Sequence, residues 1–295
     1  MLSRWRPLFA DWILAAQPGG GVCEGRRAAL TVSFDCDHRA DVRALPRLLD
    51  MLRAANLRAA FACVGRWVEE FPEEHGRIVS EGHEILNHSH THPDNEELCP
   101  ERRFRDLGPG EKREEIASCH AACREVLGVE PRGFRAPHFG SNFSPEDYAL
   151  LRDFGYVYSS SAIAIETASL GAPFRVEEGL WEFPLSPCPR HPFSIFDSWH
   201  TTSPRSPEAS HADEPDFERW FRTLVELAIR NRAYVNVYFD PQDVVLLGRF
   251  PGILQWLASR RDELVCAPYA GLVTALEDRA AAGAESSSRP GPFPS

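Results

Sequence analysis

The feature that most constrains the fold is an apolar, β-prone run over residues 28–34 that ends on two acidic side chains, Asp35 and Asp37. A run of this kind indicates a buried strand, so both acids are expected where the strand leaves the core. A second short apolar run, over residues 84–87, leads in the same way into a loop rich in histidine. Acids and histidines at the ends of separate strands are the arrangement from which α/β enzymes build their sites. The pattern therefore predicts an α/β fold with its chemistry at the strand ends.

The histidine-rich loop contains a pair with metal-ligand spacing, His88 and His92. Four residues apart, the two imidazoles converge on one ion if the segment is helical or tightly turned, and Asp37 supplies a carboxylate. Three protein ligands leave positions open for water and substrate, whereas structural zinc sites are closed by four. The competing interpretation is a solvated histidine-rich surface loop. We predict a divalent metal site, with Zn²⁺ favoured and Co²⁺ or Ni²⁺ as alternatives.

Three short motifs follow one another along the chain: Phe34-Asp35-Cys36-Asp37, then His88 to His92, then Arg135-Ala136-Pro137. In kind and order they resemble the motifs of the polysaccharide deacetylase family, also called carbohydrate esterase family 4 or the NodB homology domain. The resemblance extends from Ala28 to Asp240. It implies an α/β fold of the distorted (β/α) barrel kind found in NodB-type deacetylases. It also implies metal-dependent hydrolysis of an amide or ester bond.

The same resemblance assigns roles to individual residues. The two histidines and Asp37 match the metal ligands of the family, and Asp35 matches its general base. Arg135 is expected to hold Asp35 ionised through a charge-assisted pair, which would lower the pKa of Asp35. The backbone N–H of His138, where the family usually has Tyr, is expected to help stabilise the oxyanion. The structural alternatives are a strand-end cap for Asp35 and a surface charge for Arg135.

One position departs from the family pattern. The last motif of the family places a His at the end of the final strand, and here residues 237–241 put Asp240 in that position. An aspartate protonates a leaving amine at neutral pH only if burial or a nearby carboxylate raises its pKa. Three outcomes are open. Asp240 works as the acid, one of His138, His191 and His200 replaces it, or ordinary deacetylation has been lost.

The leading functional prediction is a hydrolase that removes an acyl group, expected to be acetyl, from an amino sugar of a glycan, a lipid-linked sugar or a precursor sugar. The Phe-Asp-X-Asp form of the first motif keeps an allantoinase-like hydrolysis of a non-sugar C–N bond as an alternative. Another alternative, favoured by Asp240, is a catalytically weakened member that keeps its metal and binds glycan. The retained base and its arginine argue against it, because a binding module needs neither. The ligand set also serves Fe(II) oxygenases, but nothing else in the chain resembles one.

The chain of 295 residues carries a formal net charge of −11. Repulsion from phosphate disfavours nucleic acid and anionic membranes as partners, so we expect a carbohydrate or another small acylated substrate. No apolar run approaches the about 20 residues needed to span a bilayer. In residues 1–17, Asp11 interrupts the apolar stretch, which argues against a signal peptide and favours a short amphipathic helix packed on the domain. We therefore expect a cytoplasmic protein, with peripheral membrane contact through this helix as the alternative.

The expected organisation is one folded domain, residues 28–282, between an N-terminal extension, residues 1–27, and a disordered tail, residues 283–295. Asp41 is expected to be the N-cap of the helix that follows the first strand. The eight cysteines lack the dense pattern of a disulfide scaffold and are interpreted as reduced thiols.

The sequence becomes irregular between residues 186 and 216, where several prolines occur. Long irregular segments in compact domains are usually functional lids or disordered. We interpret this one as a substrate-binding insertion in which Trp199 and His200 contact the substrate. A mobile surface loop is the alternative.

Overall fold

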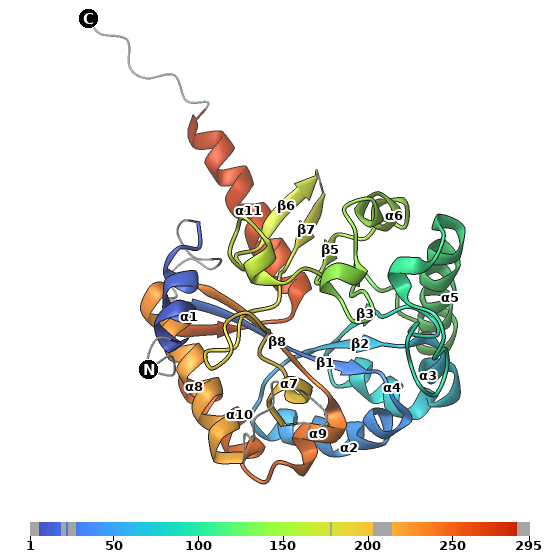
Figure 1. Cartoon of the computed structure of the whole chain (residues 1–295), viewed down its shortest axis with the longest axis horizontal. Helices are drawn as coiled ribbons and strands as arrows, with labels where there is room; N and C mark the ends of the chain where they lie inside the picture. The colour runs from blue at the N-terminus through green and yellow to red at the C-terminus, as the bar shows by residue number, and fades with distance from the viewer. Residues whose placement is uncertain (1–5, 19–21, 23–27, 178, 203–213, 288–295) are drawn as a thin grey trace, which may run out of the picture.

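Strands and helices alternate along most of the chain and form a curled sheet with helices on its outer side (Figure 1). The computed structural model describes residues 6–18, 22, 28–177, 179–202 and 214–287. The strands of this part are β1 (Ala28–Cys36), β2 (Ala60–Cys63), β3 (Glu84–Asn87), β4 (Gly133–Phe134), β5 (Tyr158–Ser159), β6 (Phe174–Glu177), β7 (Leu180–Glu182), β8 (Tyr234–Phe239) and β9 (Leu264–Cys266). Its α-helices are α1 (Arg6–Ala15), α2 (Arg39–Ala54), α3 (Gly65–Glu70), α4 (Pro72–Ser80), α5 (Pro109–Leu127), α6 (Asp147–Asp153), α7 (Ser198–Thr202), α8 (Glu214–Asn231), α9 (Pro241–Leu246), α10 (Phe250–Ser259) and α11 (Tyr269–Ser287). Short 3-10 helices are η2 (Phe104–Asp106), η3 (Gly140–Asn142) and η4 (Ala164–Glu166).

The sheet runs in the order β6, β7, β5, β4, β3, β2, β1, β8, with β9 beside the first residues of β1. Neighbouring strands are parallel except β6 and β7, which form an antiparallel pair at one edge. Beyond β7 the chain approaches β8 at the opposite edge, where the backbone N–H of Ser186 donates to the carbonyl of Asn236 at 2.9 Å. Irregular backbone thus connects the two edges of a curled half-barrel. The predicted α/β fold of the distorted (β/α) barrel kind is confirmed.

The central strand β1 is buried along its whole length. The residues of β1 alternate between its two faces: Leu30, Val32 and Phe34 pack in the apolar core, whereas Thr31, Ser33 and Asp35 are buried polar residues on the other face. The ring of Phe34 lies 5.2 Å from that of Phe61 on β2 and 6.3 Å from that of Phe239 on β8. An aromatic core therefore anchors the end of β1 from which Asp35 and Asp37 emerge.

Helix α2 covers this strand with an apolar stripe, but it begins differently from the prediction. Its N-cap is His38, so the prediction that Asp41 occupies this position is wrong. Asp41 is the third residue of the helix and completes a capping box, accepting the backbone N–H of His38 at 2.9 Å. The stripe is buried as expected and consists of Leu45, Leu48, Leu49 and Leu52. Each buried leucine contributes about 1.5–3 kcal/mol, which holds α2 to the sheet.

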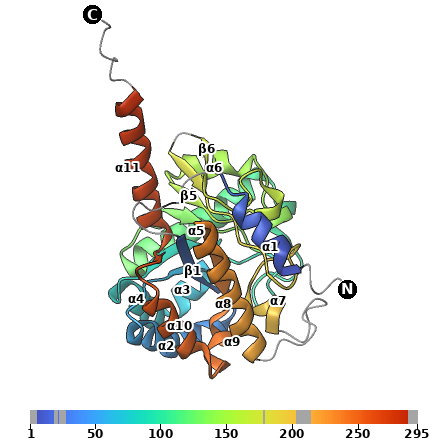
Figure 2. The ribbon, with the colours of Figure 1, turned by 90° about the vertical axis from the view of Figure 1, so that its left-hand side faces the viewer.

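Helix α1 packs on α8, as predicted for the N-terminal segment (Figure 2). Its buried side chains are Ala10, Ile13 and Leu14. Asp11, which interrupts the apolar stretch, accepts a hydrogen bond from Asn231 at 2.7 Å and pairs with Arg230. The polar interruption thus fastens α1 to the domain. Within the described residues, no helix is both long enough and apolar enough to cross a bilayer.

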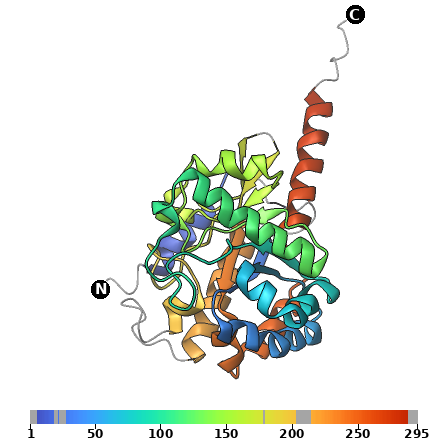
Figure 3. The same cartoon turned by 90° about the vertical axis from the view of Figure 1, so that its right-hand side faces the viewer.

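Helix α11 projects from the body of the molecule (Figure 3). It is anchored through Glu277, which accepts a hydrogen bond from Trp181 Nε1 at 2.6 Å and pairs with Arg175. The helix continues to Ser287, beyond the predicted boundary at residue 282, because its alanine-rich sequence has high helix propensity. Parts of the expected extension and tail lie outside the described residues, namely 1–5, 19–21, 23–27 and 288–295.

Candidate functional site

The carboxyl ends of β1 and β3 lie at the same end of the sheet, because both strands run parallel to β2, which lies between them. His88 Nε2 lies 3.1 Å from Asp37 Oδ1, and His92 Nε2 lies 3.4 Å from the same oxygen. One ligand atom from each of these residues lies within 4.8 Å of the other two. The three predicted ligands therefore form a candidate metal site.

A tight turn brings the second histidine back beside the first. Ser89 and His92 have positive φ angles of 61° and 50°, which non-glycine residues keep only where the surroundings hold them. The side-chain oxygen of Asn87 accepts the N–H of Ser89 at 2.9 Å, and Ser89 Oγ accepts the N–H of His92 at 3.1 Å. Glu115 on α5 accepts two further backbone N–H groups of the turn. Of the two conformations compatible with the histidine spacing, the structure adopts the turn.

Several buried polar atoms of this cluster lack a hydrogen-bond partner in the described part of the chain. They are Asp37 Oδ1 and both ring nitrogens of His92. By contrast, His88 Nδ1 lies 2.8 Å from the carbonyl oxygen of Arg135, which leaves Nε2 as its ligand atom. Burial lowers the pKa of His92 to about 3, so its ring is neutral, as metal ligation requires. Two imidazoles and a carboxylate that converge without other partners fit a divalent cation.

Asp35 and Arg135 form a buried ion pair beside the cluster. Their exposed fractions are 1% and 0%, and Arg135 Nη1 donates to Asp35 Oδ1. The other oxygen, Asp35 Oδ2, lies 3.8 Å from His88 Nε2. Burial raises the pKa of Asp35 by more than Arg135 lowers it, so the expectation of a lowered pKa is wrong. Because Arg135 is fully buried, its interpretation as a surface charge is also wrong.

Arg135 is surrounded by hydroxyl groups that the sequence did not single out. Arg135 Nη2 donates to Ser33 Oγ at 2.9 Å, to Ser160 Oγ at 3.0 Å and to Tyr269 OH at 2.6 Å. Tyr269 OH in turn donates to Asn236 Oδ1 at 2.8 Å. These residues are spread over most of the chain and carry no motif. Only the folded structure identifies them as the groups that hold the guanidinium.

His138 lies on the loop that follows β4, next to the cluster. Its ring centroid is 4.9 Å from that of His92, and its backbone has a positive φ of 54°. Among the described residues, the backbone N–H of His138 has no hydrogen-bond acceptor. The side chain is exposed. The loop therefore presents both a ring and a donor at the rim of the site.

Asp240 follows β8 and is the N-cap of α9. Ser198 Oγ donates to Asp240 Oδ2 at 3.3 Å and accepts the backbone N–H of Asp240 at 2.8 Å. Burial, followed by the nearby carboxylates of Asp41 and Asp37, raises the pKa of Asp240 well above its usual range. This is the condition under which an aspartate acts as an acid near neutrality. Sequence analysis missed Ser198, because it lies in the irregular segment after β7.

The two predicted substrate contacts of that segment belong to helix α7. Trp199 follows Ser198 and is 42% exposed, so its indole is accessible at the surface. The side chain of His200 and residues 203–213 of the predicted insertion lie outside the described residues. The substrate role of both residues stays a prediction.

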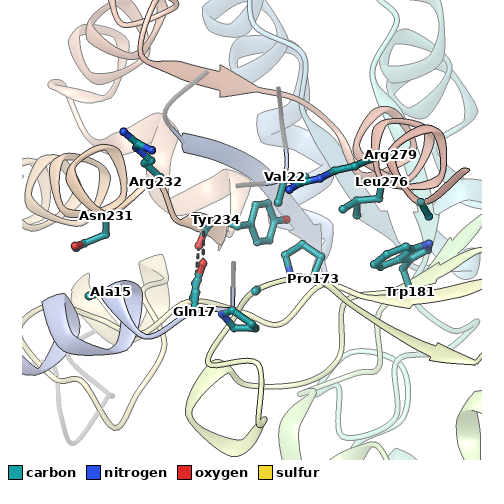
Figure 4. Close-up of a pocket in the computed structure, with 13 residues that line it drawn as sticks. Ala15, Gln17, Val22, Pro173, Trp181, Asn231, Arg232, Tyr234, Leu276 and Arg279 are labelled. Carbon is teal, nitrogen blue, oxygen red and sulfur yellow. Dashed lines mark hydrogen bonds between the residues drawn. The ribbon is translucent and has the colours of Figure 1, made fainter. Parts of the chain in front are cut away.

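A separate cavity of about 670 Å³ lies at the other end of the sheet (Figure 4). Tyr234 lines it at the start of β8, whereas Asp240 follows the opposite end of that strand. Gln17 accepts the backbone N–H of Tyr234 at 2.9 Å and donates to its carbonyl at 3.0 Å, as a neighbouring strand would. These two hydrogen bonds attach the end of the N-terminal segment to the sheet at the wall of the cavity. The amino ends of barrel strands generally serve stability, and this arrangement agrees with that role.

Comparisons with known proteins agree with this geometry. Residues 24–159 match the family model described as polysaccharide deacetylase. A peptidoglycan-N-acetylglucosamine deacetylase of Bacillus cereus is 29% identical over 107 residues, which are 36% of this chain and 36% of that protein. A chitooligosaccharide deacetylase of Bradyrhizobium sp. is 35% identical over 97 residues, 32% of this chain and 39% of that protein. A crystal structure of a Mycobacterium smegmatis protein assigned to the polysaccharide deacetylases superposes with a TM-score of 0.72 at 20% identity, covering 90% of this chain and 95% of that one.

Residues 24–159 are therefore similar to the polysaccharide deacetylase family, and the resemblance of the three motifs, which all lie in this segment, is confirmed. The matched segments span 36% and 39% of the length of the two curated relatives. The likeness to the Mycobacterium smegmatis structure shows that the fold is shared.

Proposed function

We propose that this protein is a metal-dependent hydrolase that removes an acyl group, first of all acetyl, from an amino sugar of a glycan or of a precursor sugar. The observation that carries the proposal is the meeting of three ligand-type side chains with a buried Asp–Arg pair at one edge of the sheet. A binding module has a use for the ligands but none for the ion pair. The two curated relatives, described as deacetylases of peptidoglycan N-acetylglucosamine and of chitooligosaccharide, support an amino sugar as substrate.

Asp37, His88 and His92 would hold the cation, which their donor atoms suggest is Zn²⁺, with Co²⁺ or Ni²⁺ as alternatives. When bound, such a cation polarises the acyl carbonyl and lowers the pKa of a water molecule. The chain prepares these ligands in two ways. The carbonyl of Arg135 accepts the Nδ1 proton of His88 and thereby directs Nε2 to the site. Burial keeps the ring of His92 neutral.

Asp35 acts as the general base. Its Oδ1 accepts from Arg135, so Oδ2 takes the proton of the attacking water. The guanidinium keeps the carboxylate oriented and balances its charge in a buried setting. The backbone N–H of His138, which has no acceptor among the described residues, is assigned to the developing oxyanion.

Asp240 protonates the leaving amine. Its raised pKa keeps a proton available near neutral pH, and Ser198 holds its carboxyl group in place. Trp199, exposed beside Ser198, is assigned to the sugar ring, against which an indole packs well. His200 is also assigned to contact with the sugar, solely because it follows Trp199 in the sequence.

The test is metal-dependent release of acetate. Protein stripped with a chelator is reloaded with Zn²⁺, Co²⁺ or Ni²⁺ and assayed on N-acetylglucosamine oligomers, with allantoin as the non-sugar substrate. We expect acetate release to follow metal loading and to fall about 10²–10⁴-fold in Asp35→Asn. The control variant Asp50→Asn, which changes an exposed aspartate on α2, should keep the wild-type rate.

Two results would contradict this function. Tight metal binding without turnover of any substrate would indicate a glycan-binding role. Formation of allantoate without acetate release would move the activity to a non-sugar C–N bond.

A further inference from the structure

Asp240 occupies the N-cap position of α9 but does not cap that helix. An N-cap aspartate ordinarily accepts the backbone N–H of the second or third helical residue with its own carboxylate. Asp240 makes no such bond, and its Oδ2 accepts from Ser198 Oγ at 3.3 Å instead. The first turn of α9 therefore obtains its acceptor from elsewhere.

Asp41 on the neighbouring helix α2 is that acceptor. Its Oδ1 accepts the backbone N–H of Gln242, the second residue of α9, at 3.1 Å, and its Oδ2 accepts the N–H of His38 at 2.9 Å. Asp41 is fully buried between α2 and α9, which pack against each other (Figure 1). The carboxylate of Asp41 thus links His38, which follows Asp37, to the first turn of α9, which follows Asp240.

Only one of these two bonds serves α2 itself. The capping box of α2 needs the bond from His38 to Oδ2, and the bond from Gln242 to Oδ1 is additional. The N–H of Gln242 is also the group that an N-cap side chain at Asp240 would bind. Whichever carboxylate accepts from Gln242 therefore decides where the carboxylate of Asp240 points.

We propose that Asp41 is a positioning residue, which caps α9 in place of Asp240 and so leaves the Asp240 carboxylate on the Ser198 side. The proposal rests on the proposed function, in which Asp240 protonates the leaving amine. When Asp41 is removed, the N–H of Gln242 loses its acceptor. Asp240 then turns onto it by rotation about its Cα–Cβ bond and adopts the usual N-cap geometry. The carboxyl group of Asp240 then no longer faces the site, although Asp240 itself is unchanged.

A double-mutant cycle tests this action through Asp240. The kcat for acetate release is measured for Zn²⁺-loaded wild type, Asp41→Ala, Asp240→Asn and the double variant, with Asp50→Asn as the control on the same helix. We expect Asp41→Ala to lower kcat at least about tenfold, and by no more than Asp240→Asn, since it acts only through that residue. The double variant should be no slower than Asp240→Asn, and bound Zn²⁺ should stay at the wild-type stoichiometry. An equal loss from Asp41→Ala in both backgrounds would overturn the proposal, because it would show a purely structural role.

A crystal structure decides the same question without activity. The second variant, Asp41→Ser, keeps a short polar group near His38 that does not reach α9, and serves where Asp41→Ala does not fold. An Asp240 carboxylate on the N–H of Gln242 supports the proposal, and one still bonded to Ser198 overturns it. If the wild type releases no acetate from any sugar, the proposed function fails, while this structural comparison still decides the role of Asp41.

Discussion

The two sides of the candidate site are built in different ways. The base side consists of Asp35, Asp37, His88, His92 and Arg135, and the acid side of Asp240, Ser198 and Trp199. Base-side residues stand at strand ends or in the turns directly after them, and all except Asp37 are at most 1% exposed. On the acid side, Asp240 is half-buried at a helix end, and its partner comes from the irregular segment after β7.

The difference lies in how each charge is balanced. The buried carboxylate of Asp35 has a guanidinium partner, and that guanidinium has its own hydroxyl shell. Within the described residues, the carboxyl of Asp240 accepts only from the hydroxyl of Ser198, and burial together with nearby carboxylates raises its pKa. The base side is therefore determined by the barrel itself. The acid side depends on neighbours contributed by α2 and α7.

The largest effect should come from removing a base-side ligand. We expect His92→Ala to lose bound metal and to reduce acetate release to the background rate, because no other ligand-type side chain of the described residues belongs to the cluster. Metal content by elemental analysis, together with the acetate assay, measures both effects. His120→Ala, which removes a histidine on α5, is the control and should keep metal and activity. Full metal occupancy in His92→Ala would show that His92 is not a metal ligand and that the base side does not form the predicted metal site.

Breaking the buried ion pair between Asp35 and Arg135 should mainly lower the free energy of unfolding. In Arg135→Met, Asp35 stays buried without its cation, and the loss of one partner of such a pair destabilises by about 3–5 kcal/mol. Urea unfolding gives the free energy of unfolding of both proteins. The matched control is Arg113→Met, which breaks an exposed pair with Asp153 and should cost less than about 1 kcal/mol.

The double variant Asp35→Asn/Arg135→Met sharpens this measurement. It leaves no unpaired charge in the core, so it should be more stable than Arg135→Met alone. If Arg135→Met unfolds at the wild-type urea concentration, the base side is not held by this pair, and the contrast between the two sides disappears.

The base side could be predicted because its residues sit in short local patterns. Acids after a β-prone run and a histidine pair with ligand spacing are visible in the sequence, and the strand order then brings them together. The sequence did not reveal the direction of the pKa shift of Asp35. Burial raises this pKa and Arg135 lowers it, and the degree of burial is a property of the fold. The hydroxyls of Ser160 and Tyr269 were equally invisible, because their contact with Arg135 joins residues far apart in the chain.

The acid side was predictable only as a departure from the family pattern. The position of Asp240 was found by its place after the last long strand, but neither Ser198 nor Asp41 could be assigned to it. Asp41 was interpreted as an ordinary N-cap, and its bond to Gln242 arises only because α2 and α9 pack together. Irregular segments and contacts between helices carry no periodic signal that would reveal such partners.

A smaller loss of activity is expected when Asp240, the proposed acid, is replaced. Asp240→Asn keeps the shape of the side chain but cannot release a proton, so kcat should fall about 10²-fold, at the low end for a general acid, with bound metal unchanged. Asp240→His restores the residue usual in the family and should recover turnover at neutral pH. Steady-state kinetics of the three proteins, with metal content as the control, measures this. Wild-type kcat in Asp240→Asn would exclude Asp240 as the acid and direct attention to the histidines of the neighbouring loops.

The smallest effect tests the charge argument at a carboxylate away from the site. In the described part of the chain, the hydrogen-bond donors to Glu84, at the start of β3, are neutral and include Tyr158 OH at 2.9 Å and the backbone N–H of Ala270 at 3.2 Å. Burial raises its pKa to about 6, above the value of about 4.3 in an unfolded chain. Between these values the folded protein keeps a proton that the unfolded chain has lost. The stabilising contribution of Glu84 is therefore complete below about pH 4 and is lost as the pH rises through about 6.

In Glu84→Gln this dependence disappears. The stability of the wild type relative to the variant should therefore fall by at most about 2 kcal/mol between about pH 4 and 7, as measured by urea unfolding across that range. Asp50→Asn, at an exposed carboxylate, should show no comparable trend. A relative stability that rises with pH would mean that neutral donors keep Glu84 ionised in the folded state. A buried carboxylate would then need no cation to stay charged, and Arg135 would be required at Asp35 for orientation more than for charge.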